Sequence, residues 1–339
     1  MQKKLIVLAV AGLVSSGAFA ADNVTLYGSF DAGLRNLSNS NGAGQSLTTM
    51  ASNGTFNSNR LGFTGKEDLG NGLNAHFDLE TGFNSGTGAT DTNNVGNFWN
   101  RTASLGLGGS WGSLDLGNQY TAIFHTVAAY DPFHYKYVGI IPMAGLDGAR
   151  RNNDIQYTGN FGAVTARVEH AVGQVPGSTA AGATTEGGLS YAAGGLSLGT
   201  AYGTQKDPTG QLTTKNWTVG GAYKTGPFEV AAGYDKKTAD KLVGNAGDTK
   251  NWWLGGSYSM TQAAALVVGY YDTKTTNVLA IDGQQKLSIV GATYALSKRT
   301  TFYADIDHKN LDGSLVVGYG GAQTQGNQTG VSVGINHAF

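Results

Sequence analysis

The stretch VTLYGSFDAGL (residues 24–34) decides the fold class, because apolar and polar side chains alternate along it. Leu26 and Leu34 fall on one face of the pattern, whereas Thr25 and Asp31 fall on the other. A two-residue period predicts a β-strand with one apolar and one polar face. One such strand also fits a soluble β-sandwich, so the choice between a sandwich and a membrane barrel depends on how often the pattern recurs.

The same alternation recurs along the whole chain and predicts sixteen strands. Single-chain bacterial membrane barrels require an even number of strands, and most of these segments have the roughly 9–11 residues that cross a bilayer when tilted. Only a closed barrel satisfies every backbone hydrogen-bonding group of such strands inside lipid. The predicted strands lie near residues 24–36, 58–66, 73–83, 101–109, 112–119, 151–159, 162–171, 186–193, 196–205, 214–224, 227–236, 250–259, 263–273, 285–295, 300–309 and 329–339.

The connections between these segments alternate between short turns and long polar loops. Transmembrane barrels have short periplasmic turns and longer outer loops, so we expect an all-β, 16-stranded antiparallel transmembrane β-barrel with both ends of the chain on the periplasmic side. The short turns span residues 67–72, 192–195, 224–227, 259–262 and 295–299, and the long loops span 37–57, 84–100, 172–185, 237–248 and 311–328.

Aromatic side chains cluster near the predicted strand ends, where their amphipathic rings suit the two membrane–water interfaces. The last segment, VSVGINHAF (331–339), alternates up to the terminal Phe339 and resembles the assembly signal of outer-membrane barrels. The aromatic residues expected on the lipid face are Trp217, Tyr223, Phe228, Tyr234, Trp252, Tyr258, Tyr270 and Tyr294.

The N-terminal segment predicts export from the cytoplasm. Lys3 and Lys4 precede a short apolar run at residues 5–14, and AFA (18–20) has the small-residue pattern of a cleavage site. This arrangement is typical of a secretory signal peptide, so we expect cleavage after Ala20 and a mature barrel spanning residues 21–339. The alternative is a membrane-anchoring helix, but the run is shorter than the roughly 20 residues that a helical span needs.

Composition excludes several classes of protein. Charged residues make up 13% of the chain, about half the share of a soluble domain, and glycine contributes 53 of 339 residues. The absence of cysteine excludes disulfides and cysteine-based metal sites. Without Lys3 and Lys4, 20 basic residues oppose 23 acidic ones, and this net charge of −3 gives no indication of a nucleic-acid partner.

Six strings spread from the first strand to the last resemble the Gram-negative general porin family, in the branch common among β-proteobacteria. The longest string, which starts at Asn59, is the most specific. The strings are VTLYGSFDAGL (24–34), NRLGFTGKEDLGNGLNAHFDLETGF (59–83), LGNQYT (116–121), RRNNDIQYTGNFG (150–162), YALSKRTTFYA (294–304) and VGINHAF (333–339).

The resemblance implies a homotrimeric outer-membrane porin whose third outer loop, about residues 121–148, folds into the barrel and narrows it. Residues 122–130 of that loop could include a short helix. The resemblance also implies a basic cluster on the opposite wall, at Arg60, Arg101 and Arg150. Asn118 stands where relatives often have arginine, and the loop lacks the PEF string of the enteric branch.

Strand parity tests this basic cluster independently. Arg60 and Arg150 fall on the polar faces of their strands and therefore point into the lumen. Strict alternation instead groups Arg101 with Ala103 and Leu105, so a bulge or a position at the rim would have to turn Arg101 inward. Asp78 and Glu80 also point inward, and the hairpin should bring both close to Arg60, where opposite charges attract.

The third loop adds the carboxylates Asp131 and Asp147 against Lys136. We therefore expect a constriction formed by Arg60, Arg101, Arg150, Asp131, Glu80 and Asp78.

An enzyme is the main rival class, and the histidines show no catalytic pattern. A hydrolase would need a positioned serine–histidine or carboxylate–histidine group. No glycine-rich phosphate loop is present either, because no GKS or GKT follows the glycines. We therefore expect no catalytic residue, cofactor or metal. The histidines are His76, His125, His134, His170, His308 and His337.

The sequence predicts a water-filled outer-membrane channel for passive diffusion of small hydrophilic solutes. Rings of arginine or lysine favour anions, so inorganic and organic anions should pass preferentially. Two alternatives stay open at this point. One is a surface adhesin or antigen whose barrel is plugged, and the other is a substrate-specific channel.

Overall fold

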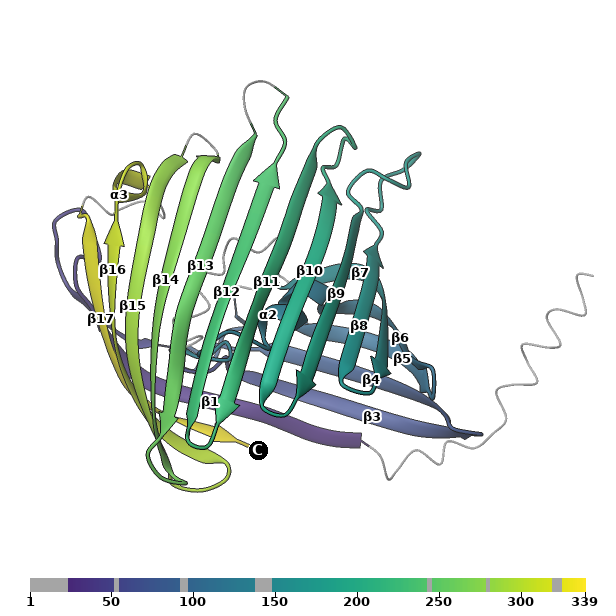
Figure 1. Cartoon of the computed structure of the whole chain (residues 1–339), viewed down its shortest axis with the longest axis horizontal. Helices are drawn as coiled ribbons and strands as arrows, with labels where there is room; N and C mark the ends of the chain where they lie inside the picture. The colour runs from purple at the N-terminus through teal and green to yellow at the C-terminus, as the bar shows by residue number, and fades with distance from the viewer. Residues whose placement is uncertain are drawn as a thin grey trace, which may run out of the picture.

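A computed structural model describes residues 24–51, 55–91, 97–137, 148–242, 246–278, 281–318 and 325–339. Seventeen strands form one antiparallel sheet, and Figure 1 shows that the sheet closes into a barrel. The strands are β1 (Val24–Leu37), β2 (Leu47–Ala51), β3 (Arg60–Gly70), β4 (Leu73–Gly82), β5 (Thr102–Gly109), β6 (Gly112–Tyr120), β7 (Arg150–Phe161), β8 (Val164–Ala171), β9 (Thr184–Ala193), β10 (Leu196–Lys206), β11 (Thr213–Thr225), β12 (Phe228–Ala239), β13 (Gly247–Ser259), β14 (Ala264–Val278), β15 (Ile281–Ala295), β16 (Thr300–Leu311) and β17 (Asn327–Ala338).

The short strand β2 does not cross the membrane as part of the barrel wall. It pairs with the loop end of β1, from Gly33 to Leu37, while β3 pairs with the other end of β1, from Val24 to Ser29. Without β2 the wall has the sixteen strands expected from the sequence, and the closed barrel is confirmed. The expected loop at 37–57 was therefore partly wrong, because residues 47–51 extend the sheet.

The two ends of the sheet join where β17 pairs with β1. The terminal residue completes this seam: the Phe339 and Gly28 backbones exchange two hydrogen bonds, at 3.0 and 3.1 Å. A Cβ at Gly28 would lie 2.4 Å from the Phe339 ring, so the ring occupies the space that a side chain would need. The C-terminal phenylalanine is thus part of barrel closure.

Apolar side chains cover the outside of the barrel, where Leu254 is 52% exposed. Six of the eight aromatic residues expected on this face are among the exposed large hydrophobics, and Tyr234 and Tyr270 are half-buried. Trp217 packs against Tyr234, with ring centroids 5.1 Å apart, at the end of the long loops. Phe228 and Tyr258, 4.8 Å apart, lie at the end of the short turns, so aromatic pairs mark both edges of the apolar band.

The described part of the third loop, residues 121–137, lies inside the barrel, where its first turn contacts β8 to β11 and its later residues pack against β13 to β16. It begins with helix α2 (Ala122–Val127), which Figure 1 shows behind the near wall, inside the barrel. The expected short helix in this loop is confirmed. Downstream of α2, Tyr130, Phe133 and Tyr137 form a buried cluster with the inward-facing Trp253, Tyr271, Leu287, Ile289 and Tyr303.

Glycines on the inner wall make room for this loop. At each of them an added Cβ would lie within 3 Å of a loop side chain, so a larger residue would push the loop into the lumen. The glycine track consists of Gly199 facing Thr126 and Tyr130, Gly220 facing Tyr130, Gly255 facing Pro132, Gly269 facing Phe133 and Gly291 facing Tyr137.

The other described helix, α3 (Leu315–Gly318), is a single turn beside β15. Across the described ranges, no helix is long and apolar enough to cross a membrane. The expected signal peptide at residues 1–20 and the loop carboxylate Asp147 lie outside the described residues.

Candidate functional site

A buried ion pair stands at the centre of the candidate constriction. Arg101 Nε donates to Glu80 Oε1 at 2.6 Å, and the two residues are 3% and 5% exposed. Arg101 Nη1 also lies 3.9 Å from Asp91 Oδ2. Strict alternation grouped Arg101 with Ala103 and Leu105, but β5 begins at Thr102, so the pleat of the strand does not dictate where Arg101 points.

Tyr120, at the end of β6, joins two of the arginines. Its hydroxyl accepts hydrogen bonds from Arg101 Nη2 at 2.9 Å and from Arg150 Nη2. The Arg150 guanidinium carbon lies 3.9 Å from the centroid of the Tyr120 ring, a cation–π contact. The ring in turn stacks on Phe124 of α2 at 4.5 Å. The role of Tyr120 was not predicted from the sequence, although the Tyr120–Arg150 cross-strand pairing brings together two of the family-like strings.

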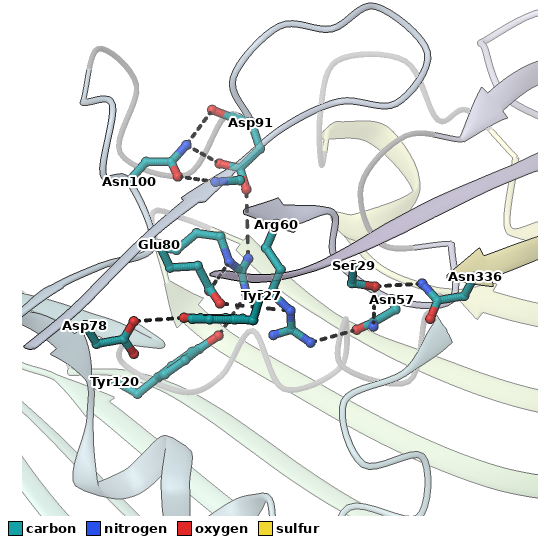
Figure 2. A network of polar contacts seen from close by, with 12 residues as sticks. Tyr27, Ser29, Asn57, Arg60, Asp78, Glu80, Asp91, Asn100, Tyr120 and Asn336 are labelled. Carbon is teal, nitrogen blue, oxygen red and sulfur yellow. Dashed lines mark hydrogen bonds and ion pairs between the residues drawn. The ribbon is translucent and has the colours of Figure 1, made fainter. Parts of the chain in front are cut away.

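Arg60 approaches the same group from β3. Arg60 Nε lies 4.0 Å from Glu80 Oε2, and its Nη2 donates to Asn57 Oδ1 at 3.4 Å. Figure 2 shows Arg60, Glu80 and Tyr120 converging from different elements. The Arg60 side chain stays 29% exposed. The three arginines predicted from the sequence therefore meet around Glu80 and Tyr120.

Asp78 takes a different partner from the expected one. It accepts a hydrogen bond from the Tyr27 hydroxyl at 2.8 Å, as Figure 2 shows. In the β3–β4 register Asp78 faces Thr64, four residues along β3 from Arg60, whereas Glu80 faces Gly62. The hairpin thus brings Glu80 to Arg60 and leaves Asp78 nearer the short-turn end of the wall.

Asp131 anchors the third loop and does not line the lumen, contrary to the expectation from the sequence. It is 0% exposed, accepts a hydrogen bond from the Tyr271 hydroxyl at 2.6 Å, and accepts another from the Tyr135 backbone N–H at 2.7 Å. Burial raises the pKa of this carboxyl. The alternation of side chains along strands could not predict the burial of Asp131, because it says nothing about how an irregular loop packs.

Lys136 brings a positive charge from the loop toward Arg60. Its Nζ lies 5.5 Å from the centroid of the Phe56 ring. Burial and the neighbouring Arg60 lower the pKa of Lys136 to about 8, although Asp31 opposes this shift. Asp31 itself is buried and accepts a hydrogen bond from the Tyr303 hydroxyl at 2.8 Å. The loop thus contributes an ammonium group whose pKa is lowered to about 8.

Two wall carboxylates fix the start of the loop. Glu169 on β8 accepts from the Ala122 backbone N–H at 2.7 Å, and Glu186 on β9 accepts from the Ile123 N–H at 3.3 Å. Carboxylates at a helix N-terminus satisfy free N–H groups and complement the helix dipole. Arg151 lies 3.5 Å from Glu186. In the described part of the chain, no group of three histidine or acidic side chains could hold a metal ion.

A closed transmembrane barrel with a loop packed inside it and a cluster of arginines defines a channel of the outer membrane. The chain belongs to the Gram-negative porin family, whose model matches residues 6–314. It is an outer-membrane channel protein.

Individual relatives agree with this assignment. Outer membrane porin protein 32 of Delftia acidovorans is 32% identical over the full length of both chains. An outer membrane porin protein of Bordetella pertussis is 27% identical, also over both full lengths. Among solved structures, the anion-selective porin from Comamonas acidovorans superposes with a TM-score of 0.81 at 27% identity, covering 93% of this chain and 99% of that chain. The trimer form of OmpT of Vibrio cholerae, at 17% identity, shares the fold with a TM-score of 0.70 over 93% of this chain and 99% of that one.

Proposed function

We propose that the protein is a channel for passive diffusion of small hydrophilic solutes in which Arg60, Arg101 and Arg150 set a preference for inorganic and organic anions. The observation that carries this proposal is the meeting of the three guanidinium groups around Tyr120 and Glu80. Arginine keeps its charge at any workable pH, and low-dielectric walls focus its field within the narrow part of a pore.

The charges within this constriction do not contribute equally. Glu80 is bonded to Arg101 and therefore offsets much of its charge. Arg150 stacks on the neutral ring of Tyr120. Arg60 lies 4.0 Å from Glu80, a looser contact than the 2.6 Å ion pair of Arg101 with Glu80. Arg60, Arg150 and Lys136 thus supply the net positive field, while Asp78 stays bonded to Tyr27. The similar protein from Comamonas acidovorans is an anion-selective porin, which supports the same direction of selectivity.

Reconstituted channels test the proposal through conductance and permeation. Stepwise openings in a planar bilayer are expected, and solutes of matched size should enter liposomes in the order anion, neutral, cation. Arg150→Gln should reduce the advantage of the anion, whereas Arg299→Gln at a short turn should not. A closed barrel without openings would instead favour the plugged adhesin, and faster entry of cations would contradict the anion preference.

We also propose that the working unit is a homotrimer. The resemblance of the chain to general porins supports this, as does the trimer form of OmpT, which shares the fold. Light scattering in mild detergent, corrected for bound detergent, should give a mass of three chains. A stable monomer that conducts normally would contradict the proposal.

We infer a cleaved signal peptide at residues 1–20, a mature barrel at 21–339 and a constriction loop at about 121–148. The basic, apolar and AFA regions of the N-terminus support the cleavage site. N-terminal sequencing of protein from the outer membrane should begin at Ala21. We infer no enzymatic role, because the polar groups of the constriction that the structure describes bind one another and form no nucleophile–base pair there.

A further inference from the structure

A recess opens on the inner wall of the barrel near the short turns, between the third loop and strands β9 to β12. It holds about 540 Å³, a size that suits a small-molecule ligand. Its lining shares no residue with the constriction at Arg60, Arg101 and Arg150. Because most of the lining is small and apolar, a branched alkyl group can enter without displacing the wall. We call this space the alanine recess, after Ala128 and Ala129 of the loop and Ala192, Ala193 and Ala222 of the wall.

Two opposite charges in the lining of the alanine recess lie side by side without binding each other. Lys224 on β11 directly opposes Glu229 on β12 in the strand register. Within the described ranges, the Lys224 side chain makes no hydrogen bond or ion pair. Glu229 Oε1 lies 3.2 Å from His134 Nε2, and Glu229 Oε2 binds nothing in the same ranges. Directly opposite charges usually attract across a sheet, so an unpaired ammonium and carboxylate leave both signs of charge open to a ligand.

A strained turn of the third loop brings His134 to this carboxylate. His134 and Tyr135 have φ angles of 48° and 59°, a left-handed conformation that is costly for residues other than glycine. Asp131 holds the turn: its Oδ2 accepts from the Tyr135 N–H at 2.7 Å, and its backbone carbonyl accepts from the His134 N–H at 3.0 Å. The contact with His134 thus directs Glu229 toward the loop and leaves Lys224 without a partner.

Neither a simple anion nor a simple cation complements both charges. An anion bound to Lys224 would also face the Glu229 carboxylate, and a cation bound to Glu229 would also face the Lys224 ammonium group, so each would meet repulsion. An α-amino acid carries a carboxylate and an ammonium group on the same carbon. It can therefore form charge-assisted hydrogen bonds with Lys224 and Glu229 at once, while its side chain lies against the alanines.

We propose that the alanine recess binds a small amino acid with an aliphatic side chain in its zwitterionic form. Lys224 binds the carboxylate of the ligand, Glu229 binds its ammonium group, and the alanines surround its side chain. The inference rests on the proposed diffusion channel, because the solute reaches the recess through the open lumen. It adds to that function a class of solute that is held near the short turns, apart from the arginines.

Saturation-transfer NMR on the full chain in mild detergent tests this site. The probes are L-leucine, 4-methylpentanoate and 3-methylbutylamine, which share one alkyl body and carry both charges, the carboxylate alone or the ammonium alone. Leucine should bind roughly tenfold more tightly than either of the others. Lys224→Gln and Glu229→Gln should each weaken leucine binding by about the same factor. The matched controls Lys298→Gln and Glu67→Gln remove one charge of each sign at other short turns and should bind leucine like the wild type.

Equal binding of leucine and 4-methylpentanoate would make the recess a simple anion site and overturn the proposal, as would unchanged leucine binding in both recess variants. Stepwise KCl conductance of each form, measured in parallel, serves as the folding control and separates the two proposals. A chain that conducts KCl but binds no leucine would overturn the recess alone. A chain that binds leucine but does not conduct would support the recess and contradict the diffusion channel.

Discussion

Raising the pH from 7 to 9 should weaken the anion preference, because Lys136 loses its charge in this range. The pKa of Lys136 is lowered to about 8 by burial and Arg60. The group is therefore about nine-tenths protonated at pH 7 and about one-tenth protonated at pH 9. Because the pKa is depressed, the positive charge is present below about pH 8 and disappears above it.

Coulomb's law gives the size of the effect. A unit charge about 7 Å from a passing ion in water contributes about 0.6 kcal/mol, and screening at 0.1 M salt leaves about half of it. Anion and cation respond with opposite signs, so removing about 0.8 of a charge should lower the chloride-to-potassium permeability ratio about twofold.

Single-channel reversal potentials in a KCl gradient, recorded at pH 7, 8 and 9, measure this change. Lys136→Gln should start from the lower ratio at pH 7 and fall less than the wild type up to pH 9. His125 does not interfere, because burial and Arg167 lower its pKa to about 4 and it stays neutral over the whole range. A wild-type ratio that does not change, or a fall of the same size in Lys136→Gln, would refute the reasoning.

Three further predictions concern assembly and the loop. Deleting Phe339 should slow or prevent barrel assembly, because it removes two backbone hydrogen bonds to Gly28; normal surface levels of the deletion would contradict this. Gly220→Leu should displace the third loop, since even a Cβ would lie 2.3 Å from Tyr130, and the single-channel conductance should change, whereas an unchanged conductance would count against the glycine track. Tyr271→Phe should destabilise the loop by about 1.5–3 kcal/mol, because it removes a hydrogen bond to the buried Asp131; an unchanged heat-unfolding midpoint in detergent would refute that role.

The barrel could be predicted from the sequence because its strands obey a local rule. Alternation of side chains depends only on neighbours along the chain, so the inward directions of Arg60 and Arg150 follow from parity. The β2 strand was missed, since it pairs with β1 inside a polar loop and carries no membrane pattern. Arg101 lies one residue before β5, where the pleat no longer dictates direction.

Residues of the third loop were harder to predict, because their positions depend on contacts with distant strands. Asp131 is next to no charged partner in the sequence, and its burial depends on Tyr271, 140 residues away. The glycine track was also missed, although isolated glycines inside strands indicate close approach of another segment. Tyr120 belongs to one of the family-like strings, but its contacts with Arg101 and Arg150 come from three separate elements.

The reversal potential of Arg60→Glu compared with wild type tests the central account most directly. In a KCl gradient at pH 7 and low salt, the wild-type channel should show the sign expected for chloride preference. Arg60→Glu adds a carboxylate beside Glu80 and removes a guanidinium that is 29% exposed, so its potential should move clearly toward potassium. A wild-type potential of the potassium-selective sign, or a variant that matches the wild type, would contradict the account.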